Sequence, residues 1–297
     1  MLIRPLQHDD LHALLALLEL QDREPQYRSM VPDGRSVEEL ELELDDPVMY
    51  PLVLEHDGQV QAYINLCKHH DEVFLEGPLF GADLDLDDAC TLVDHALQAA
   101  RLRNYPFVDA FIDDDNKRAQ QVLHRSGFAP FRTTYIYSLA RDKVPVSEPT
   151  SGLHILDAAT IDTSVYRDLY RTTSDNWTTR LAWSDDELAE RFHNADVQLF
   201  LAYQQSTLIG HVELEYLEEE QLAEIAYFGI LPEHRGQNFG RQVVMLAVRQ
   251  AFDRHSAISH VLARAHDDER EASHTLERLG FLLSHAVIAF TAETSIP

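Results

Sequence analysis

The stretch that decides the fold is AEIAYFGILPEHRGQNFGRQVVMLAVRQAF, residues 223–252. It opens on an apolar run that predicts a buried strand, and it closes on apolar residues at helical spacing. Between them lies a polar corner with two glycines, Gly236 and Gly240. A helix N-terminus exposes unpaired amides that attract anions, and glycine lets a ligand approach the backbone. The corner therefore predicts a phosphate-binding loop, although a turn without a ligand would use the same residues.

The same order of elements occurs twice in the chain. NKRAQQVLHRSGF (116–128) and EREASHTLERLGF (269–281) share Ala, Leu, Gly and Phe at identical spacing, and each follows one strand-like run and precedes another. The intervening ARDKVPVSEPTSG holds two prolines and small polar residues, which is typical of a linker. We therefore predict an internal duplication at the scale of whole domains. The predicted ranges are 1–142 for the first domain, 143–151 for the linker and 152–297 for the second domain.

Each half predicts an α/β (α+β) fold. Its elements run as a strand, one or two helices, three strands, a helix, a strand, a helix and closing strands. Such an order favours a mixed, mostly antiparallel sheet with helices on both faces. An apolar stripe at i, i+3, i+4 and i+7 supports the central helix of each half, around Leu92 in the first and Val244 in the second.

Composition excludes several classes of function. The formal net charge of −27 makes nucleic acid an unfavourable partner, since two polyanions would have to meet. Apolar runs of membrane-spanning length are missing, so no membrane partner is expected. Cys67 and Cys90 are too few for a disulfide framework, which favours a reducing, cytoplasmic location. The histidines are scattered, and KHHDE (68–72) is better explained as a polar turn, so we expect no metal site.

In context, the corner resembles the acetyl-CoA pyrophosphate loop of the GNAT N-acetyltransferase superfamily. The loop has the pattern Arg-x-x-(Gly)-x-Gly, and the preceding strand is similar to the family's central strand. The predicted helix in REASHTLERLGF (270–281) is similar to the one that leads into the family's Gly-Phe corner. The resemblance covers the element order of essentially the whole second half. It implies acetyl-CoA as co-substrate, without a metal. The implied cofactor-binding residues are Phe228, Gly229, Ile230, Arg235, Gly236, Gln237, Asn238, Phe239, Gly240 and Arg241.

The two halves differ at this corner. Asn238 stands where the family usually has a glycine, but backbone amides make the cradle, so we expect binding to survive. The matching corner of the first half reads LDLDDA (84–89), whose carboxylates would repel a pyrophosphate and are better explained as helix caps. Asn116 in turn keeps an asparagine that the family favours. The first domain is therefore expected to be a degenerate, non-catalytic GNAT-like domain, as in mycothiol synthase-like tandem proteins.

Acetyl transfer to an amine needs a base, and often an acid for the departing thiolate. The resemblance implies the catalytic base Glu224, although this residue could simply end an acidic hairpin. Many members of the family carry a tyrosine as the acid where this chain has Leu276, and the first half has Leu123 there. Either another group protonates the thiolate, or the thiolate leaves unassisted, or the protein is not a competent enzyme. His274 is a further titratable candidate.

The acceptor side has four candidate residues. Glu213 and Glu215 alternate with apolar residues and so project from one face of a strand, where they either bind a cationic acceptor or form an exposed face. Tyr227 is a further titratable candidate. Trp177, with Asp175 beside it, lies in a loop that lines the acceptor site in the family, and packing would also explain a tryptophan there.

These observations predict an N-acetyltransferase that moves an acetyl group from acetyl-CoA to a primary amine of a small molecule, by direct attack in a ternary complex. The alternative is a non-catalytic acyl-CoA-binding or regulatory protein on the same scaffold. The expected partner is a small-molecule amine acceptor, and the chain is expected to be a monomer or a homodimer.

Overall fold

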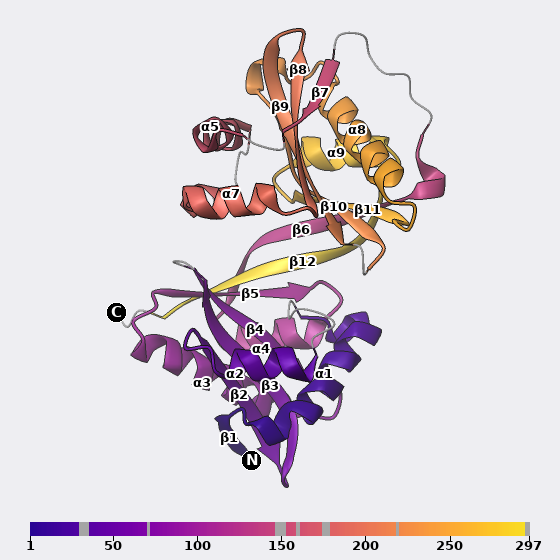
Figure 1. Cartoon of the computed structure of the whole chain (residues 1–297). Coiled ribbons are helices and arrows are strands. Elements are labelled where there is room, and N and C mark those ends of the chain that lie inside the picture. Colours follow the sequence, from indigo (N-terminus) through magenta and orange to yellow (C-terminus); the bar gives the residue numbers. More distant parts are fainter. Residues whose placement is uncertain are drawn as a thin grey trace. The chain divides into compact units, whose positions relative to one another are not determined.

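The structure, a computed structural model, describes residues 1–29, 36–69, 72–145, 153–158, 161–173, 179–217 and 220–294. The chain divides into two compact units (Figure 1). Unit 1 comprises Met1–Thr134 together with His285–Pro297, and unit 2 comprises Tyr135–Ser284.

Unit 1 is a sheet in the order β1-β2-β3-β4-β5-β12, in which only β4 and β5 pair in parallel. Leu52 and Leu54 of β2 pack with α3, whereas Val53 between them packs with α1, so helices cover both faces. Its strands are β1 (Leu2–Pro5), β2 (Met49–His56), β3 (Gln59–His69), β4 (Glu72–Phe80), β5 (Phe107–Asp113) and β12 (Leu282–Glu293). Its helices are η1 (His8–Asp10), α1 (Leu11–Arg23), η2 (Pro25–Tyr27), α2 (Val37–Leu44), α3 (Leu86–Leu102) and α4 (Lys117–Arg125).

Unit 2 repeats this plan with the order β6-β11-β10-β9-β8-β7, in which β10 and β11 pair in parallel and β10, β9, β8 and β7 pair antiparallel. Helices α8 and α9 close one core, and α5 and α7 close another on the opposite face (Figure 1). Its strands are β6 (Ala129–Ala140), β7 (Leu153–Asp157), β8 (Val197–Gln204), β9 (Thr207–Leu217), β10 (Leu222–Ile230) and β11 (His260–His266). Its helices are η3 (Arg141–Lys143), α5 (Thr163–Thr173), α6 (Thr179–Ala182), α7 (Asp185–His193), η4 (Pro232–His234), α8 (Phe239–Arg254) and α9 (Arg270–Arg278).

The helix ends follow local capping chemistry. The Ser184 hydroxyl accepts the Glu187 amide at 3.2 Å and starts α7, and the Glu187 carboxylate bonds back to Ser184, which forms a capping box. At the far end of α8, the guanidinium of Arg141 donates to three carbonyls, including Phe252 O at 2.8 Å. These contacts satisfy backbone groups that a helix terminus leaves without partners, and they tie the C-terminal end of α8 to Arg141.

Each sequence repeat gives its last strand to the other unit. Tyr137 and Leu139 of β6 are buried in the core of unit 2, whereas Phe290 of β12 is buried in the core of unit 1. Strand β12 pairs with β5 from Val287↔Asp113 to Glu293↔Phe107. The compact units therefore differ from the predicted ranges 1–142 and 152–297 at their ends. Most of the predicted linker, residues 146–151, lies outside the described residues.

The predicted fold class is confirmed: two successive α/β units, each with a mixed, mostly antiparallel sheet between helices. In the part of the chain that the structure describes, none of the helices combines the length and apolar character that a membrane crossing requires.

The strand exchange predicts where damage from a mutation in β12 will be felt. Phe290→Ala should destabilise unit 1 by about 3–5 kcal/mol, because a large side chain leaves that core. Hydrogen exchange of the variant should rise in α3 and β5 and stay unchanged in α8. Leu283→Ala, at an exposed position of the same strand, is the control. A rise confined to α8 would show that β12 belongs to unit 2.

Candidate active site

The two parallel strands of unit 2 part from one another. Their pairing runs from Leu222↔His260 to Ile225↔Ala263, whereas β10 continues to Ile230 and β11 to His266. On its other side β10 changes register against β9 between Ile225 and Tyr227, which marks a β-bulge. A cleft of about 870 Å³ opens here, lined by residues 225–230, by the loop before α8 and by the first turns of α9.

The loop at the end of the cleft has the backbone of an anion site. It leaves β10 through η4 and enters α8, whose N-cap is Asn238. Asn238 has φ 68° and Gly236 has φ 74°, both in the left-handed region. Asparagine tolerates that region better than other side chains do, so it adopts here the conformation that a glycine would take.

The structure brings nine of the ten predicted cofactor-binding residues to the cleft, and the tenth, Gln237, is exposed on the loop. A Cβ placed on Gly240 would meet only Ile230, with its Cγ1 at 3.8 Å. The described residues around Gly240 therefore leave room for a side chain at this position. The residues that line the cleft are Phe228, Gly229, Ile230, Arg235, Gly236, Asn238, Phe239, Gly240 and Arg241.

The lining of the cleft is rich in positive charge although the chain carries a net charge of −27. Arg235 has a structural part, because its Nε donates to Ile230 O at 3.0 Å and its Nη2 to Thr173 O at 3.1 Å, which joins the loop to the end of α5. The arginines outnumber the carboxylates around the opening, so the cleft favours an anion over a cation. The arginines are Arg235, Arg241, Arg264, Arg270 and Arg278, and the carboxylates are Asp268, Glu269 and Glu271.

Glu224, the predicted base, lies on β10 before the strands part. Its carboxylate accepts a hydrogen bond from Arg264 Nη2 to Oε2 at 2.9 Å, and its Oε1 forms an ion pair with Arg264 Nε. Arg264 lines the cleft, and the Glu224 side chain is 12% exposed. The Arg264 guanidinium occupies the carboxylate oxygens that would have to accept the proton. Glu224 can act as a base only if Arg264 turns away or a water relays the proton.

Glu213 and Glu215 share one face of β9, as their alternation predicts, and both bind Arg191 at 2.7 Å. Glu213 is fully buried and also accepts hydrogen bonds from Tyr166 at 3.1 Å and Arg180 at 3.0 Å. Because its carboxylate already has two arginine partners, a cationic acceptor would have to displace them. The geometry supports a structural ion-pair network here and gives no support to an acceptor contact.

Tyr227 lines the cleft, with its ring edge-on to Tyr170 at 5.2 Å between centroids. Burial raises the pKa of Tyr227, so it is a neutral phenol at physiological pH. His274 also lines the cleft, whereas Leu276 is fully buried in the core beneath α9. Trp177 and Asp175 lie outside the described residues.

Several residues that line the cleft were not predicted from the sequence, and His211 is one of them. His211 of β9 is 1% exposed and lines the cleft, and neither ring nitrogen has a hydrogen-bond partner among the described residues. Burial lowers the pKa of His211 to about 4, so the ring is neutral at pH 7. It stands two residues before Glu213 in the same alternation, which would have placed it on this face.

In unit 1 the matching strands are held apart by the chain itself. Parallel pairing of β4 and β5 covers only Phe74↔Asp109 and Leu75↔Ala110. Beyond it, Ser29 forms a β-bridge with Ile112 of β5, and its hydroxyl donates to Pro78 O of β4 at 3.2 Å. The place that the cleft takes in unit 2 is therefore occupied in unit 1 by a residue of its own N-terminal segment.

The corner before α3 has the opposite polarity to the loop before α8. The guanidinium of Arg118 donates hydrogen bonds to three backbone carbonyls there, among them Gly81 O at 3.2 Å and Ala82 O at 2.6 Å. Asp85 caps the helix by accepting the Asp87 amide at 2.7 Å. A corner that points carbonyls at an arginine and places a carboxylate at its helix N-terminus disfavours a phosphate.

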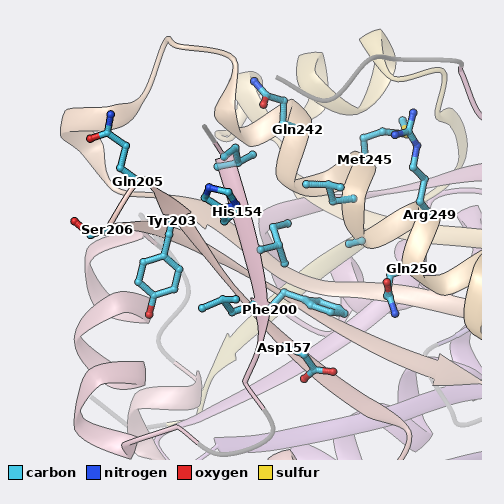
Figure 2. Close-up of a pocket in the computed structure, with 15 residues that line it drawn as sticks. His154, Asp157, Phe200, Tyr203, Gln205, Ser206, Gln242, Met245, Arg249 and Gln250 are labelled. Carbon is cyan, nitrogen blue, oxygen red and sulfur yellow. The ribbon is translucent and has the colours of Figure 1, made fainter. Parts of the chain in front are cut away.

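A second cavity of unit 2, of about 760 Å³, lies between β7 and α8 (Figure 2). Phe200 and Met245 form part of its apolar wall, and Gln242, Arg249 and Gln250 of α8 stand along its rim (Figure 2). It has neither parted strands nor a helix N-terminus, and in the described chain no three His, Cys, Asp or Glu side chains gather as a metal would require. The cleft beside β10 is therefore the better candidate for chemistry.

The buried network predicts unequal effects of two similar substitutions. Glu213→Gln should cost about 3–5 kcal/mol of stability, because it removes the buried carboxylate that pairs with Arg180 and leaves Arg191 only the partly exposed Glu215. Glu215→Gln should cost about 0–1 kcal/mol, since that carboxylate is partly exposed and Arg191 keeps Glu213. Urea unfolding followed on unit 2 measures both, and equal costs would contradict the network.

Comparison with known proteins identifies the domain. Residues 163–281 match the Acetyltransferase (GNAT) family, and no curated protein matches the chain. A tandem GNAT protein from the clavulanic acid biosynthesis pathway superposes with a TM-score of 0.70 at 14% identity, over 100% of this chain and 99% of that one. A GCN5-related N-acetyltransferase from Sphaerobacter thermophilus gives 0.70 at 15% identity, over 99% and 96%. Residues 163–281 thus match the GNAT acetyltransferase family, and the whole chain has the fold of tandem GNAT proteins.

Proposed function

We propose that this protein is an acetyl-CoA-dependent N-acetyltransferase that acts on a primary amine of a small molecule. The observation that carries the proposal is the parting of β10 and β11 above a left-handed loop at the start of α8, inside an arginine-rich cleft. A long ligand with phosphates at one end and amide groups along its length suits this combination. Coenzyme A is such a ligand, and the GNAT family uses acyl-CoA.

The parts of the cleft would serve different parts of acetyl-CoA. The amides of residues 236–241 would hold the pyrophosphate at the N-terminus of α8. The backbone groups of β10 beyond Ile225 and of β11 beyond Ala263 would bond to the amides of the pantetheine arm, since their mutual pairing has ended there. The thioester would then lie beside β10, where a backbone amide can stabilise the developing oxyanion.

Transfer requires an uncharged amine and an exit for the thiolate. The amine nitrogen attacks the thioester carbon, the carbon–sulfur bond breaks, one proton leaves the nitrogen and one reaches the sulfur. We assign the first proton to Glu224, directly or through water, after it is released from Arg264. The second is assigned to the neutral phenol of Tyr227, because Leu276 cannot supply one.

The alternative function, acyl-CoA binding without catalysis, is favoured by two observations. Glu224 is held by Arg264, and Leu276 is buried in place of an acid. We also propose that unit 1 binds no coenzyme, because Ser29 and Arg118 fill the corresponding positions. Both alternatives for unit 2 require acetyl-CoA to bind, so binding and turnover are tested separately.

Acetyl-CoA binding should depend on the space at Gly240. Gly240→Trp fills the cleft with an indole, and calorimetry should show acetyl-CoA affinity at least about 100-fold weaker, equivalent to about 2.7 kcal/mol. Gly81→Trp is the matched control at the corner of unit 1, where a Cβ meets nothing within 4 Å, and it should keep normal affinity. Equal affinity in Gly240→Trp would place the coenzyme elsewhere.

Turnover should depend on Glu224. In a thiol-release assay over a panel of primary amines, Glu224→Gln should lower kcat by roughly 10²–10⁴ while acetyl-CoA affinity stays normal. Glu215→Gln, a carboxylate of the neighbouring strand paired in register with Glu224, is the control. Full turnover in Glu224→Gln would remove it as the base, and no thiol release with any amine would leave coenzyme binding as the function.

A further inference from the structure

We propose that His211 positions the acyl acceptor by a hydrogen bond from its neutral imidazole on the α5 side of the cleft. The proposal rests on the proposed function, and it deepens it by naming the contact and the class of amine. Sequence comparison did not point to His211; its place in the structure does.

His211 lies beside the strand that holds the thioester. In the β9–β10 register His211 is opposite Gly229, which places no side chain beside the imidazole on that face. The side chain of Thr173 covers Gly229 from α5, so closely that a Cβ on the glycine would come within 2.4 Å of it. The Thr173 hydroxyl turns back to donate to Leu169 O at 2.8 Å. The His211 ring is therefore a polar group of the lining at this point, together with the hydroxyls of Tyr170 and Tyr227.

The ring nitrogens of His211 have no partner in the described chain, although the residue is 1% exposed. The nearest polar neighbours are engaged elsewhere: Tyr166, whose ring centroid is 6.1 Å away, donates to Glu213, and Glu213 is held by Arg180 and Arg191. Buried polar side chains in native proteins almost always have a partner. Because His211 also lines the cleft, we infer that a bound molecule supplies it.

The chemistry of the ring selects the ligand group. A neutral imidazole offers one N–H donor and one lone pair, so it fits an uncharged amine or a neighbouring hydroxyl. A neutral imidazole does not bind an ammonium group as a counter-ion would. The carboxylate of Glu213, two residues along the same strand, is already neutralised by Arg180 and Arg191. The site therefore favours amines that are partly uncharged at neutral pH and carry adjacent hydroxyls, as amino sugars do, over aliphatic polyamines.

The test compares two variants with glucosamine and spermidine as acceptors. His211→Leu removes both hydrogen-bonding groups, and its KM for glucosamine should rise about tenfold, the effect of one lost hydrogen bond, with normal acetyl-CoA affinity by calorimetry. His211→Asn keeps a donor and an acceptor and should restore most of the wild-type KM. In the absence of ligands His211→Leu should melt no lower than the wild type, since it removes an unpartnered buried group.

The outcomes separate the two proposals. If wild-type protein bound no acetyl-CoA, the proposed function would fail. If acetyl-CoA bound normally but His211→Leu kept the wild-type KM for glucosamine, or if His211→Asn were as impaired as His211→Leu, only the role of His211 would fail. A lower melting temperature of unliganded His211→Leu would show that the ring has a structural partner, and faster turnover of spermidine than of glucosamine would overturn the class of acceptor.

Discussion

The cleft that we propose as the active site depends on the backbone pairing of two strands that stops early. β10 and β11 pair in parallel for four residues each and then separate, while the flanking strands keep the sheet intact. Backbone groups that would have bonded across the ladder then need other partners. The loop that follows β10 turns through left-handed residues into α8, so a helix N-terminus stands at the mouth of the same opening. The separated strands and the N-terminus of α8 thus line the same cleft, which in our proposal holds one elongated ligand.

Unit 1 shows what happens when the same geometry is satisfied internally. Its parallel strands also pair over a short stretch, but Ser29 bridges to β5 and bonds to β4. Arg118 donates to the carbonyls of the corner before α3, which corresponds to the loop before α8 in unit 2. The two repeats therefore share one backbone plan and differ in the source of the hydrogen-bond partners for the separated strands. In unit 1 the chain itself supplies them, and in our proposal for unit 2 a ligand does.

Much of this could be predicted from the sequence, because apolar periodicity and glycine-bearing corners are local signals. The duplication predicted two α/β units, and the corner at Gly236–Gly240 predicted the loop. The exchange of β6 and β12 was not predictable, since either copy of the strand satisfies the same pattern of apolar residues. Partners such as Arg264 for Glu224 and Arg180 for Glu213 are dozens of residues distant along the chain. His211 needed knowledge of which buried groups lack a partner, and only the packed structure gives it.

The central claim, that one of two similar units binds coenzyme, is tested most directly by the stoichiometry of acetyl-CoA binding. Isothermal calorimetry on the full chain should give one site per chain, with Arg118→Ala failing to create a second. Two sites per chain would contradict the account of unit 1, and the absence of any site would contradict the account of the cleft in unit 2.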